Sequence, residues 1–423
     1  MVIGGGGTGA ALAYDLSLRG CRVTLFERGE LTSGTTGRHH GQLHCGARYA
    51  VQDREIGREC MRESEILRRI APASIEFNHG LFVAITEEDE QYCRTFFPAC
   101  QACGIPARLL TAAQALAMEP YLNPRLRLAV QVPDGSMDAW RMALQFFASA
   151  KARGADIRNF SEVIGLKVAA DGEAARSSRI IGVRIRDHRS GSEYELTADL
   201  VINATGAWSK SVVGLAGIDI AVSPSPGTMV AVKGRLTNMV ISRLHPAADG
   251  DIIVPQRNLS IIGTTQRLTA DPDRITVPHR DVEKMLRSAE IMVPGFKKAP
   301  FHAAWAAARP LVGEVSNSVG VRDLSRDFSL IDHGEAGGVG RFLSIIGGKA
   351  TTLRGMAEIT ADRSCELLGI ESACRTAELP LLPARSLYRG RAGVSAHPGV
   401  RAAKTGNLPA KAATESRSGE RNI

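Results

Sequence analysis

The chain has 423 residues, of which 44% are hydrophobic and 23% are charged. These proportions are ordinary for a soluble globular enzyme, and the length favours two domains over one. No run of about 18 apolar residues occurs, and no charged-then-apolar leader precedes Gly4. We therefore expect no membrane span and no secretion signal, and a location in the cytoplasm or on the inner face of the cell membrane.

The formal net charge of +8 is concentrated near the C-terminus. Eight Lys or Arg but only two Glu follow residue 384, among many Gly, Ala, Pro and Ser. This composition predicts a basic, disordered tail over 383–423 and leaves the rest of the chain nearly neutral. We expect no nucleic-acid partner. The tail is either solvated without a partner or weakly attracted to anionic lipid, which would give peripheral membrane contact.

The first predicted elements surround a cluster of glycines. Residues 1–9 read Met-Val-Ile-Gly-Gly-Gly-Gly-Thr-Gly, and a second apolar run over 23–26 ends at Glu27. A strand, a glycine turn, a helix, a second strand and an acid together form a dinucleotide-binding unit. In such a unit Gly4 permits the tight turn, Gly6 lets the backbone approach a pyrophosphate, and Gly9 lets helix and strand pack closely.

The start of this helix and Glu27 predict how the nucleotide is held. Backbone N–H groups from Thr8 onward point at the phosphates, and the helix dipole favours their negative charge. Glu27 can accept hydrogen bonds from an adenosine ribose. Only Met1, Val2 and Ile3 precede the turn, so either starting residues are missing or the first strand is ragged.

The rest of the chain alternates between two kinds of segment. Segments typical of a nucleotide domain recur near 155–206 and 342–368, and the stretches between them are typical of a separate sheet. We therefore predict an α/β fold: a Rossmann-like domain over 1–75, 135–218 and 340–382, and an inserted α+β substrate domain, on a mostly antiparallel sheet, over 76–134 and 219–339. The predicted helices are 51–71, 87–103, 137–153, 280–292 and 350–369, and the predicted strands are 79–85, 157–168, 180–186, 200–206, 219–233, 251–265 and 342–348.

Eight cysteines are present, and in the cytoplasm we expect them to be reduced. Cys100 and Cys103 have the CxxC spacing, but no second CxxC follows to complete a metal site. We therefore predict no metal site and interpret the pair as two small residues at a helix end.

Seven segments, taken together and in order, resemble the FAD-dependent glycerol-3-phosphate dehydrogenase family, most closely the A subunit of its anaerobic enzyme. The resemblance implies FAD as the cofactor and a fold of the glutathione-reductase/D-amino-acid-oxidase type. It also implies oxidation of sn-glycerol 3-phosphate to dihydroxyacetone phosphate, with electrons passed to a quinone or a partner subunit. The segments are residues 2–9 with 27–28, 36–50, 132–135, 203–209, 254–255 with 262–265, 308–311, and 347–354.

The chain also departs from the family pattern. It lacks the C-terminal cysteine-rich region of the anaerobic subunit, which puts in doubt any partner that docks there. Six residues differ near the predicted flavin and substrate, so another polyol phosphate such as erythritol phosphate, an amine oxidase reaction on the same fold, and a non-catalytic flavoprotein stay open as alternatives. These residues are His39, Gln42, Cys45, Ala308, Ala350 and Leu353, where the family usually has Asn, Leu, Ser, Val, Leu and Tyr.

Oxidation of an alcohol needs a base for the hydroxyl proton. His44, aligned with a histidine of the family motif, is the candidate, because an imidazole can take up a proton near neutral pH. His40, in the same loop, is the alternative base or a support for the flavin. Both histidines could instead only hydrogen-bond the loop backbone.

A phosphate ester needs cationic ligands, and guanidinium groups match pairs of phosphate oxygens. Arg48 and Arg309 fit this role, and Arg326 resembles a third phosphate ligand of the family; the alternative for each is a surface salt bridge. Lys349 follows two glycines at a helix start and adds a positive charge beside the reduced flavin or the phosphate. Tyr49 completes the predicted substrate site.

Two sets of site residues are therefore predicted. The catalytic set is His44, Arg48, Arg309 and Lys349. The cofactor-binding set is Gly4, Gly6, Gly9, Glu27, Arg28, Thr36, His40, Gly206, Gly348 and Lys349.

Overall fold

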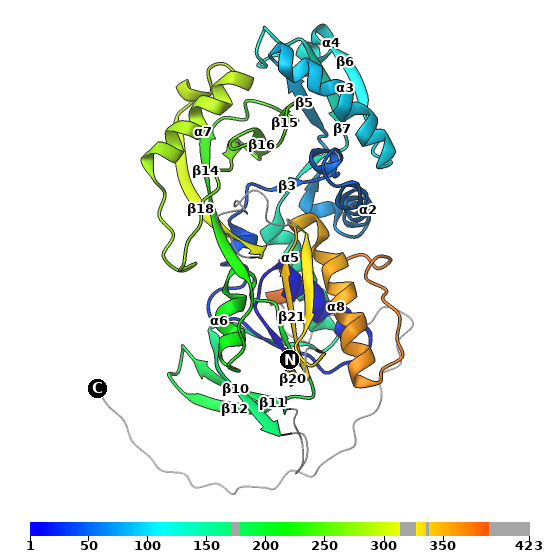
Figure 1. The fold of residues 1–423 in the computed structure, drawn as a ribbon, viewed down its shortest axis with the longest axis vertical. Helices are drawn as coiled ribbons and strands as arrows, with labels where there is room; N and C mark the ends of the chain where they lie inside the picture. Colours follow the sequence, from blue (N-terminus) through cyan, green and yellow to red (C-terminus); the bar gives the residue numbers. More distant parts are fainter. Residues whose placement is uncertain (171–177, 314–326, 336–337, 389–423) are drawn as a thin grey trace, which may run out of the picture. The chain divides into compact units, whose positions relative to one another are not determined.

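The structure is a computed structural model that describes residues 1–170, 178–313, 327–335 and 338–388 (Figure 1). Met1–Tyr388 forms one compact unit, built on two large β-sheets and two small ones. The predicted α/β fold is confirmed, whereas the predicted domain boundaries stay a prediction. The predicted disordered tail lies outside the described residues from Arg389 onward, and its first residues form a short 3₁₀ helix, Ala384–Tyr388.

The first large sheet has six strands in the order β19-β21-β13-β1-β2-β9. Its neighbouring strands are parallel except β19 and β21, as expected for a Rossmann-like domain. The strands are β1 (Val2–Ile3), β2 (Thr24–Phe26), β9 (Asp156–Arg158), β13 (Val201–Asn203), β19 (Phe328–Asp332) and β21 (Phe342–Gly347).

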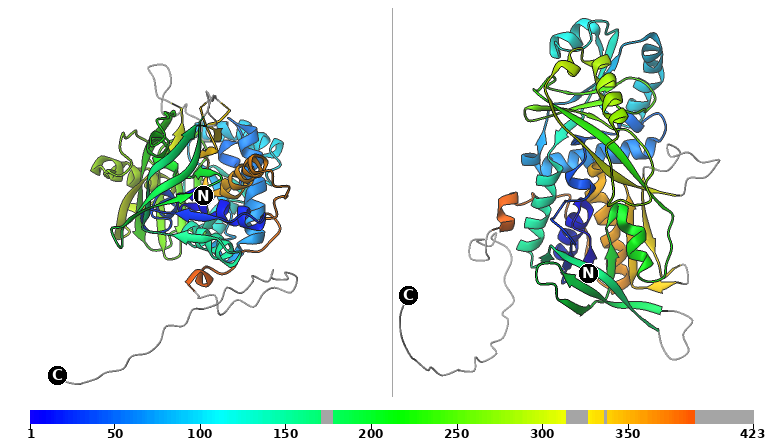
Figure 2. Two further views of the ribbon diagram at one scale, coloured as in Figure 1. Left: turned by 90° about the horizontal axis from the view of Figure 1, so that it is seen from below. Right: turned by 90° about the vertical axis from the view of Figure 1, so that its left-hand side faces the viewer.

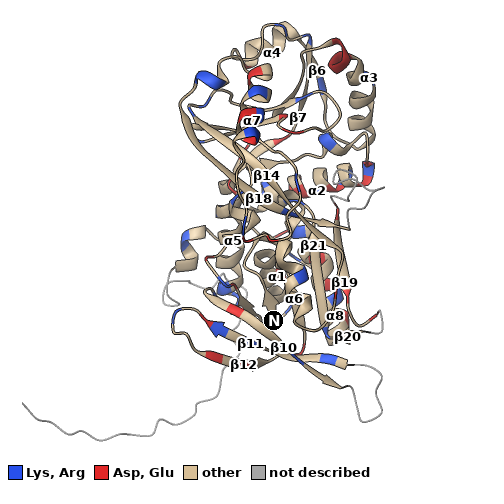
Figure 3. Ribbon diagram, turned by 60° about the vertical axis from the view of Figure 1, so that its left-hand side comes forward, with Lys and Arg blue, Asp and Glu red and all other residues tan. Residues whose placement is uncertain are grey.

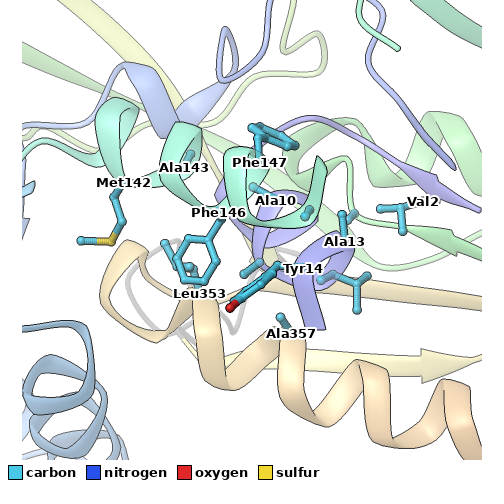
Figure 4. Close-up of a cluster of buried hydrophobic side chains, with 14 of the residues drawn as sticks. Val2, Ala10, Ala13, Tyr14, Met142, Ala143, Phe146, Phe147, Leu353 and Ala357 are labelled. Atoms are coloured by element: carbon cyan, nitrogen blue, oxygen red, sulfur yellow. The ribbon is translucent and has the colours of Figure 1, made fainter. Parts of the chain in front are cut away.

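Three helices pack together against this sheet: α1 (Gly7–Leu18), α5 (Ala139–Ala152) and α8 (Leu353–Leu368). The α1 side of the contact consists largely of alanines, which let the helices approach closely, and Tyr14 meets Phe146 edge-on with ring centres 6.2 Å apart (Figure 4). The packing fixes the start of α1, where the glycine turn lies.

The second large sheet has eight strands in the order β18-β14-β17-β16-β15-β5-β7-β6. Only β15 and β5 are parallel, so the predicted mostly antiparallel sheet is confirmed. The strands are β5 (Gly80–Ala84), β6 (Arg108–Thr111), β7 (Leu128–Val132), β14 (Val222–Lys233), β15 (Val240–Arg243), β16 (Ile252–Gln256), β17 (Leu259–Gly263) and β18 (Phe301–Val312).

Helix α7 (His279–Met292) covers part of this sheet. Its apolar side chains Met285, Ala289 and Met292 are buried against the strands. The charged residues that are coloured along this helix in Figure 3 include Arg280, Glu283, Lys284 and Arg287, which are exposed. Such a division into a buried apolar face and an exposed charged face is typical of a helix that covers a sheet.

The paired strands β14 and β18 connect the two large sheets (Figures 1 and 2). They pair from Val222 opposite Val312 to Val232 opposite Phe301. The far end of β18 contacts β21 and the 3₁₀ turn Gly206–Trp208 of the first sheet. Residues of β18 therefore reach the six-stranded sheet, which also contains β1.

Two small sheets complete the fold. One comprises β3 (Gln42–Leu43), β8 (Gly135–Met137) and β4 (Ile75–Glu76) and supports the loop that contains His44. The other comprises β10 (Ser161–Ala170), β11 (Ser178–Asp187), β12 (Glu193–Thr197) and β20 (Val339–Gly340). The remaining helices are α2 (Arg54–Ile70), α3 (Glu87–Ala102), α4 (Ala112–Met118) and α6 (Ser209–Gly214).

All five predicted helices are present as α2, α3, α5, α7 and α8. The single strand predicted over 251–265 is instead the hairpin of β16 and β17, which turns at Arg257 with a φ of 54°. Residues 29–50, for which no helix or strand was predicted, contain the short strand β3. Across the described ranges, no helix is long and apolar enough to cross a lipid bilayer.

Candidate active site

Two glycines, Gly4 in the turn after β1 and Gly9 near the start of α1, have no room for a side chain. Gly4 has a φ of 111°, and a Cβ there would lie 2.6 Å from the carbonyl oxygen of Ala204. A Cβ on Gly9 would lie 2.0 Å from the carbonyl oxygen of Gly4. Only glycine therefore lets α1 begin this close to the turn, as the glycine pattern predicted.

We expect Gly9→Ala to abolish FAD binding. The added methyl group would displace backbone of the turn, because the atom it would overlap is the carbonyl oxygen of Gly4 and not the end of a flexible side chain. Flavin absorbance of the purified variant, relative to its protein absorbance, measures the loss. Gly214→Ala is the matched control, because a Cβ at Gly214 would meet no atom within 4 Å. A Gly9→Ala protein as yellow as the wild type would contradict the prediction.

A cavity of about 680 Å³ opens beside this turn. Its volume is in the range of cofactor sites. The start of α1 forms one part of the wall and supplies N–H groups and the positive end of the helix dipole. The cavity therefore fits an elongated, anionic nucleotide cofactor such as FAD. The predicted site residues that line it are Gly4, Gly6, Glu27, Arg28, Thr36, His40, His44, Tyr49, Gly206, Arg309, Gly348 and Lys349.

Glu27 and Thr36 lie where the cavity meets the glycine turn. The Glu27 carboxylate accepts hydrogen bonds from the N–H of Gly5 at 2.8 Å and the N–H of Gly29 at 2.9 Å. Thr36 Oγ1 accepts the N–H of Gly7 at 2.9 Å. These bonds fix both side chains, and each Glu27 oxygen keeps a further lone pair for a ribose hydroxyl.

Arg28 has partners that the sequence did not indicate. Both its terminal nitrogens donate to the Asp273 carboxylate, and its guanidinium lies 4.9 Å from the centre of the Trp208 ring. Trp208 Nε1 donates to the same carboxylate at 2.9 Å. Asp273 lines the cavity although it lies 245 residues from Arg28, so no local signal could have identified it.

His44 lies on a wall shared by two cavities. It lines the large cavity and a second one of about 100 Å³, as do His40, Tyr49 and Arg309. The His44 ring centre is 5.7 Å from that of Tyr49 and 6.4 Å from that of His40. A small molecule in the second cavity would therefore have a histidine between it and the larger cavity.

Burial lowers the pKa of His44 well below its ordinary value of 6.5, and the nearby His40, Arg48 and Lys349 lower it further. Burial also lowers the pKa of His40 to about 3. Both imidazoles are therefore neutral at neutral pH. His40 Nδ1 accepts the N–H of Gln42 at 3.2 Å, which is the loop-backbone contact considered as its alternative role. Within the described residues no such bond holds the His44 ring.

The lowered pKa of His44 predicts how activity depends on pH. A base must be neutral to act, and a lowered pKa keeps His44 neutral to lower pH. We therefore expect no loss of kcat/KM attributable to the enzyme until the pH falls below 6.5. A pH series with substrate ionisation fitted separately, at a phosphate pKa of about 6, measures this. An enzyme pKa of 7 or above would rule out His44 as the base.

Arg48 is held by a carboxylate. Its Nη2 donates to both oxygens of Asp251 at 2.8 Å, and the two side chains are 8% and 4% exposed. Arg48 lines only the second cavity. Arg48 therefore forms a salt bridge, as its alternative role proposed, but this salt bridge is buried and not on the surface. The binding of phosphate by Arg48 stays a prediction. Asp251 was not predicted, because no motif or spacing in the sequence connects it to Arg48.

Arg309 and Lys349 come from distant segments to the same cavity. Arg309 extends from β18, and its Nη2 donates to Thr264 Oγ1 and to the carbonyl of Thr265. The Lys349 ammonium lies 4.9 Å from the centre of the Tyr49 ring. Arg48 and Arg309 line the second cavity together. Arg326 lies outside the described residues.

Comparisons with known proteins fit this site. Residues 1–363 match the family described as DAO, FAD dependent oxidoreductase. The chain is 40% identical over 385 residues to the A subunit of anaerobic glycerol-3-phosphate dehydrogenase from Escherichia coli strain K12, covering 90% of this chain and 69% of that protein. It is 39% identical over 391 residues to the A1 subunit of the enzyme from Haloferax volcanii, covering 90% and 66%. The chain thus spans about two thirds of the length of these relatives.

Solved structures share the fold. Glycerol-3-phosphate dehydrogenase from Bacillus halodurans, solved in complex with FAD, matches with a TM-score of 0.67 at 24% identity, over 90% of this chain and 66% of that one. Glycine oxidase from Geobacillus kaustophilus matches with a TM-score of 0.68 at 23% identity, over 90% and 97%. The predicted cofactor, FAD, is confirmed by the family. The chain belongs to the DAO family of FAD-dependent oxidoreductases, among the relatives of the A subunit of anaerobic glycerol-3-phosphate dehydrogenase.

Proposed function

We propose that the chain oxidises sn-glycerol 3-phosphate to dihydroxyacetone phosphate. One observation carries the proposal: a neutral histidine, His44, and two cationic side chains, Arg309 and Lys349, line the cavity that begins at the glycine turn. An alcohol that bears a phosphate needs this combination of a base and cations. The names of the relatives at 39% and 40% identity support the same reaction.

Bound FAD would accept a hydride from the alcohol carbon. The His44 imidazole would take up the hydroxyl proton, which it can do because it is neutral and has a free lone pair at neutral pH. Arg309 and Lys349 would bind the phosphate and so orient the carbon toward the cofactor. The cofactor itself would be held by the turn at Gly4 and Gly6, by Glu27 at the ribose, and by the backbone at Gly206 and Gly348.

The names of the relatives support a partner protein as the electron acceptor. Two of these relatives are each named as one subunit of an anaerobic enzyme. A quinone is the second acceptor that we propose, and it would place the protein at the inner face of the cell membrane. To test this second acceptor, the reduced protein is mixed with a soluble quinone analogue in oxygen-free buffer. Its rate of reoxidation is compared with the rate in the same buffer without the analogue.

An anaerobic titration of the flavin absorbance tests the proposed reaction. We expect sn-glycerol 3-phosphate to bleach the flavin fully and glycerol to do so only at far higher concentration, because glycerol lacks the phosphate that the cations bind. Bleaching by erythritol phosphate alone would point to a different polyol phosphate. Bleaching by glycine or sarcosine would point to an amine oxidase. No bleaching by any of them would reject the proposal.

A further inference from the structure

Asp134 lies across from His44 at the end of a strand pair. In the three-stranded sheet, β3 and β8 are antiparallel, with Gln42 opposite Ser136 and Leu43 opposite Gly135. The next position on each strand is His44 and Asp134. Asp134 is only 2% exposed, and Arg68 of α2 fixes its backbone by donating to the carbonyls of Pro133 and Asp134 at 2.7 and 3.0 Å.

The Asp134 carboxylate binds the chain on both sides of His44. Its Oδ1 accepts the N–H of Cys45 at 2.7 Å, and its Oδ2 accepts a hydrogen bond from Gln42 Nε2 at 2.8 Å. A second segment also contributes: Oγ1 of the fully buried Thr351 accepts the N–H of His44 itself at 3.0 Å. The backbone of His44 is thus anchored to two separate parts of the fold.

This anchoring matters because the His44 ring has no orienting partner of its own in the described parts of the chain. A base usually needs its direction fixed by a second group. Here the ring is limited only by its neighbours, with ring centres of Tyr49 and His40 at 5.7 and 6.4 Å. The position of the ring therefore follows from the position of its backbone.

We propose that Asp134 is a positioning residue for the reaction, because it sets where the His44 backbone, and hence its imidazole, lies at the cavity wall. The inference rests on the proposed function of His44 as the base. Asp134 itself touches neither cavity, so its effect reaches the substrate only through His44 and the loop that carries it.

The test compares Asp134→Ala with Asp134→Asn by anaerobic rapid-mixing measurement of flavin reduction at saturating sn-glycerol 3-phosphate. We expect the alanine variant to reduce its flavin about 10²-fold more slowly, the size of effect that a displacement of about 1 Å produces. Its FAD content and its substrate dissociation constant should stay near wild type. The asparagine variant should recover most of the rate. Its Oδ1 can accept from Cys45, and its Nδ2 can donate to Gln42 Oε1, which has no hydrogen-bond partner among the described residues.

Glu119→Ala is the matched control. Glu119 is a second buried carboxylate, 1% exposed, that accepts the backbone N–H groups of Asn238 and Met239 at 2.8 and 2.6 Å. It lines neither cavity. Its loss should lower the melting temperature without changing the rate of flavin reduction. An equal rate loss in both variants would show a general effect of lost stability and overturn the proposal.

The remaining outcomes separate this proposal from the proposed function. A folded Asp134→Ala protein with the wild-type rate, alongside a slow His44→Ala protein, would overturn only the role of Asp134. If His44→Ala keeps the wild-type rate, or the wild type is not bleached by any polyol phosphate, the role of His44 fails and that of Asp134 fails with it. If Asp134→Ala does not fold, Asp134→Ser takes its place with the same expected loss of rate, because its shorter side chain cannot reach both partners.

Discussion

His44→Ala is expected to slow flavin reduction by sn-glycerol 3-phosphate about 10²–10⁴-fold while FAD stays bound. The variant loses the neutral imidazole that would take up the hydroxyl proton, but no contact of the glycine turn that would hold the cofactor. Anaerobic rapid mixing at saturating substrate measures the rate, and the flavin spectrum measures FAD content.

His40→Ala separates the two histidines of this wall. Since His40 Nδ1 accepts a backbone N–H from Gln42, its loss should disturb the loop and lower the rate by less than the loss of His44. A greater loss in His40→Ala than in His44→Ala would exchange their roles. Unchanged reduction in His44→Ala would remove His44 from the chemistry.

Arg309→Met is expected to weaken binding of sn-glycerol 3-phosphate by about 10–10²-fold, since a hydrogen bond to a charged group contributes about 1.5–3 kcal/mol. Oxidation of glycerol, which has no phosphate, should change little. Titration of flavin absorbance with each compound measures both affinities. An equal loss for glycerol and its phosphate would mean that Arg309 supports the fold of the site and does not bind the phosphate.

Two further variants test what Arg309 contributes. Arg309→Lys keeps the charge but loses the planar fork, so it should recover only part of the affinity. Arg48→Met should behave differently, because it would leave the Asp251 carboxylate buried without the guanidinium that pairs with it. Loss of one partner of a buried ion pair costs about 3–5 kcal/mol of stability. We therefore expect Arg48→Met to lower the melting temperature more than Arg309→Met does.

Local sequence was enough for the elements of the nucleotide unit. A glycine at φ 111°, or one whose Cβ would lie 2.0 Å from a carbonyl, leaves almost no other residue possible, so glycine spacing alone located the turn. The apolar pattern over 51–71 located α2, because Ile56, Cys60, Leu67 and Ile70 of this helix are buried. Both signals depend only on residues close together in the sequence, so they can be recognised without the tertiary structure.

The strand β18 shows where local reasoning ends. Its first eight residues, Phe-His-Ala-Ala-Trp-Ala-Ala-Ala, are rich in the residue with the strongest helix propensity, and no element was predicted for this strand. Pairing with β14 along its full length decides the outcome, because tertiary contacts override a weak propensity. That pairing is what brings Arg309 to the cavity.

The sequence by itself determined the family, the cofactor and the nucleotide-binding turn. It also indicated that the segment around His44 contains candidate site residues. Only the tertiary structure decided which partners these residues have: Asp251 for Arg48, Asp273 for Arg28, and Asp134 with Thr351 for the backbone at His44. The physical reason is that a motif reflects steric and chemical demands within a few residues. A hydrogen bond between residues 89 to 307 positions apart depends on how the strands pair and the helices pack, which no local pattern encodes.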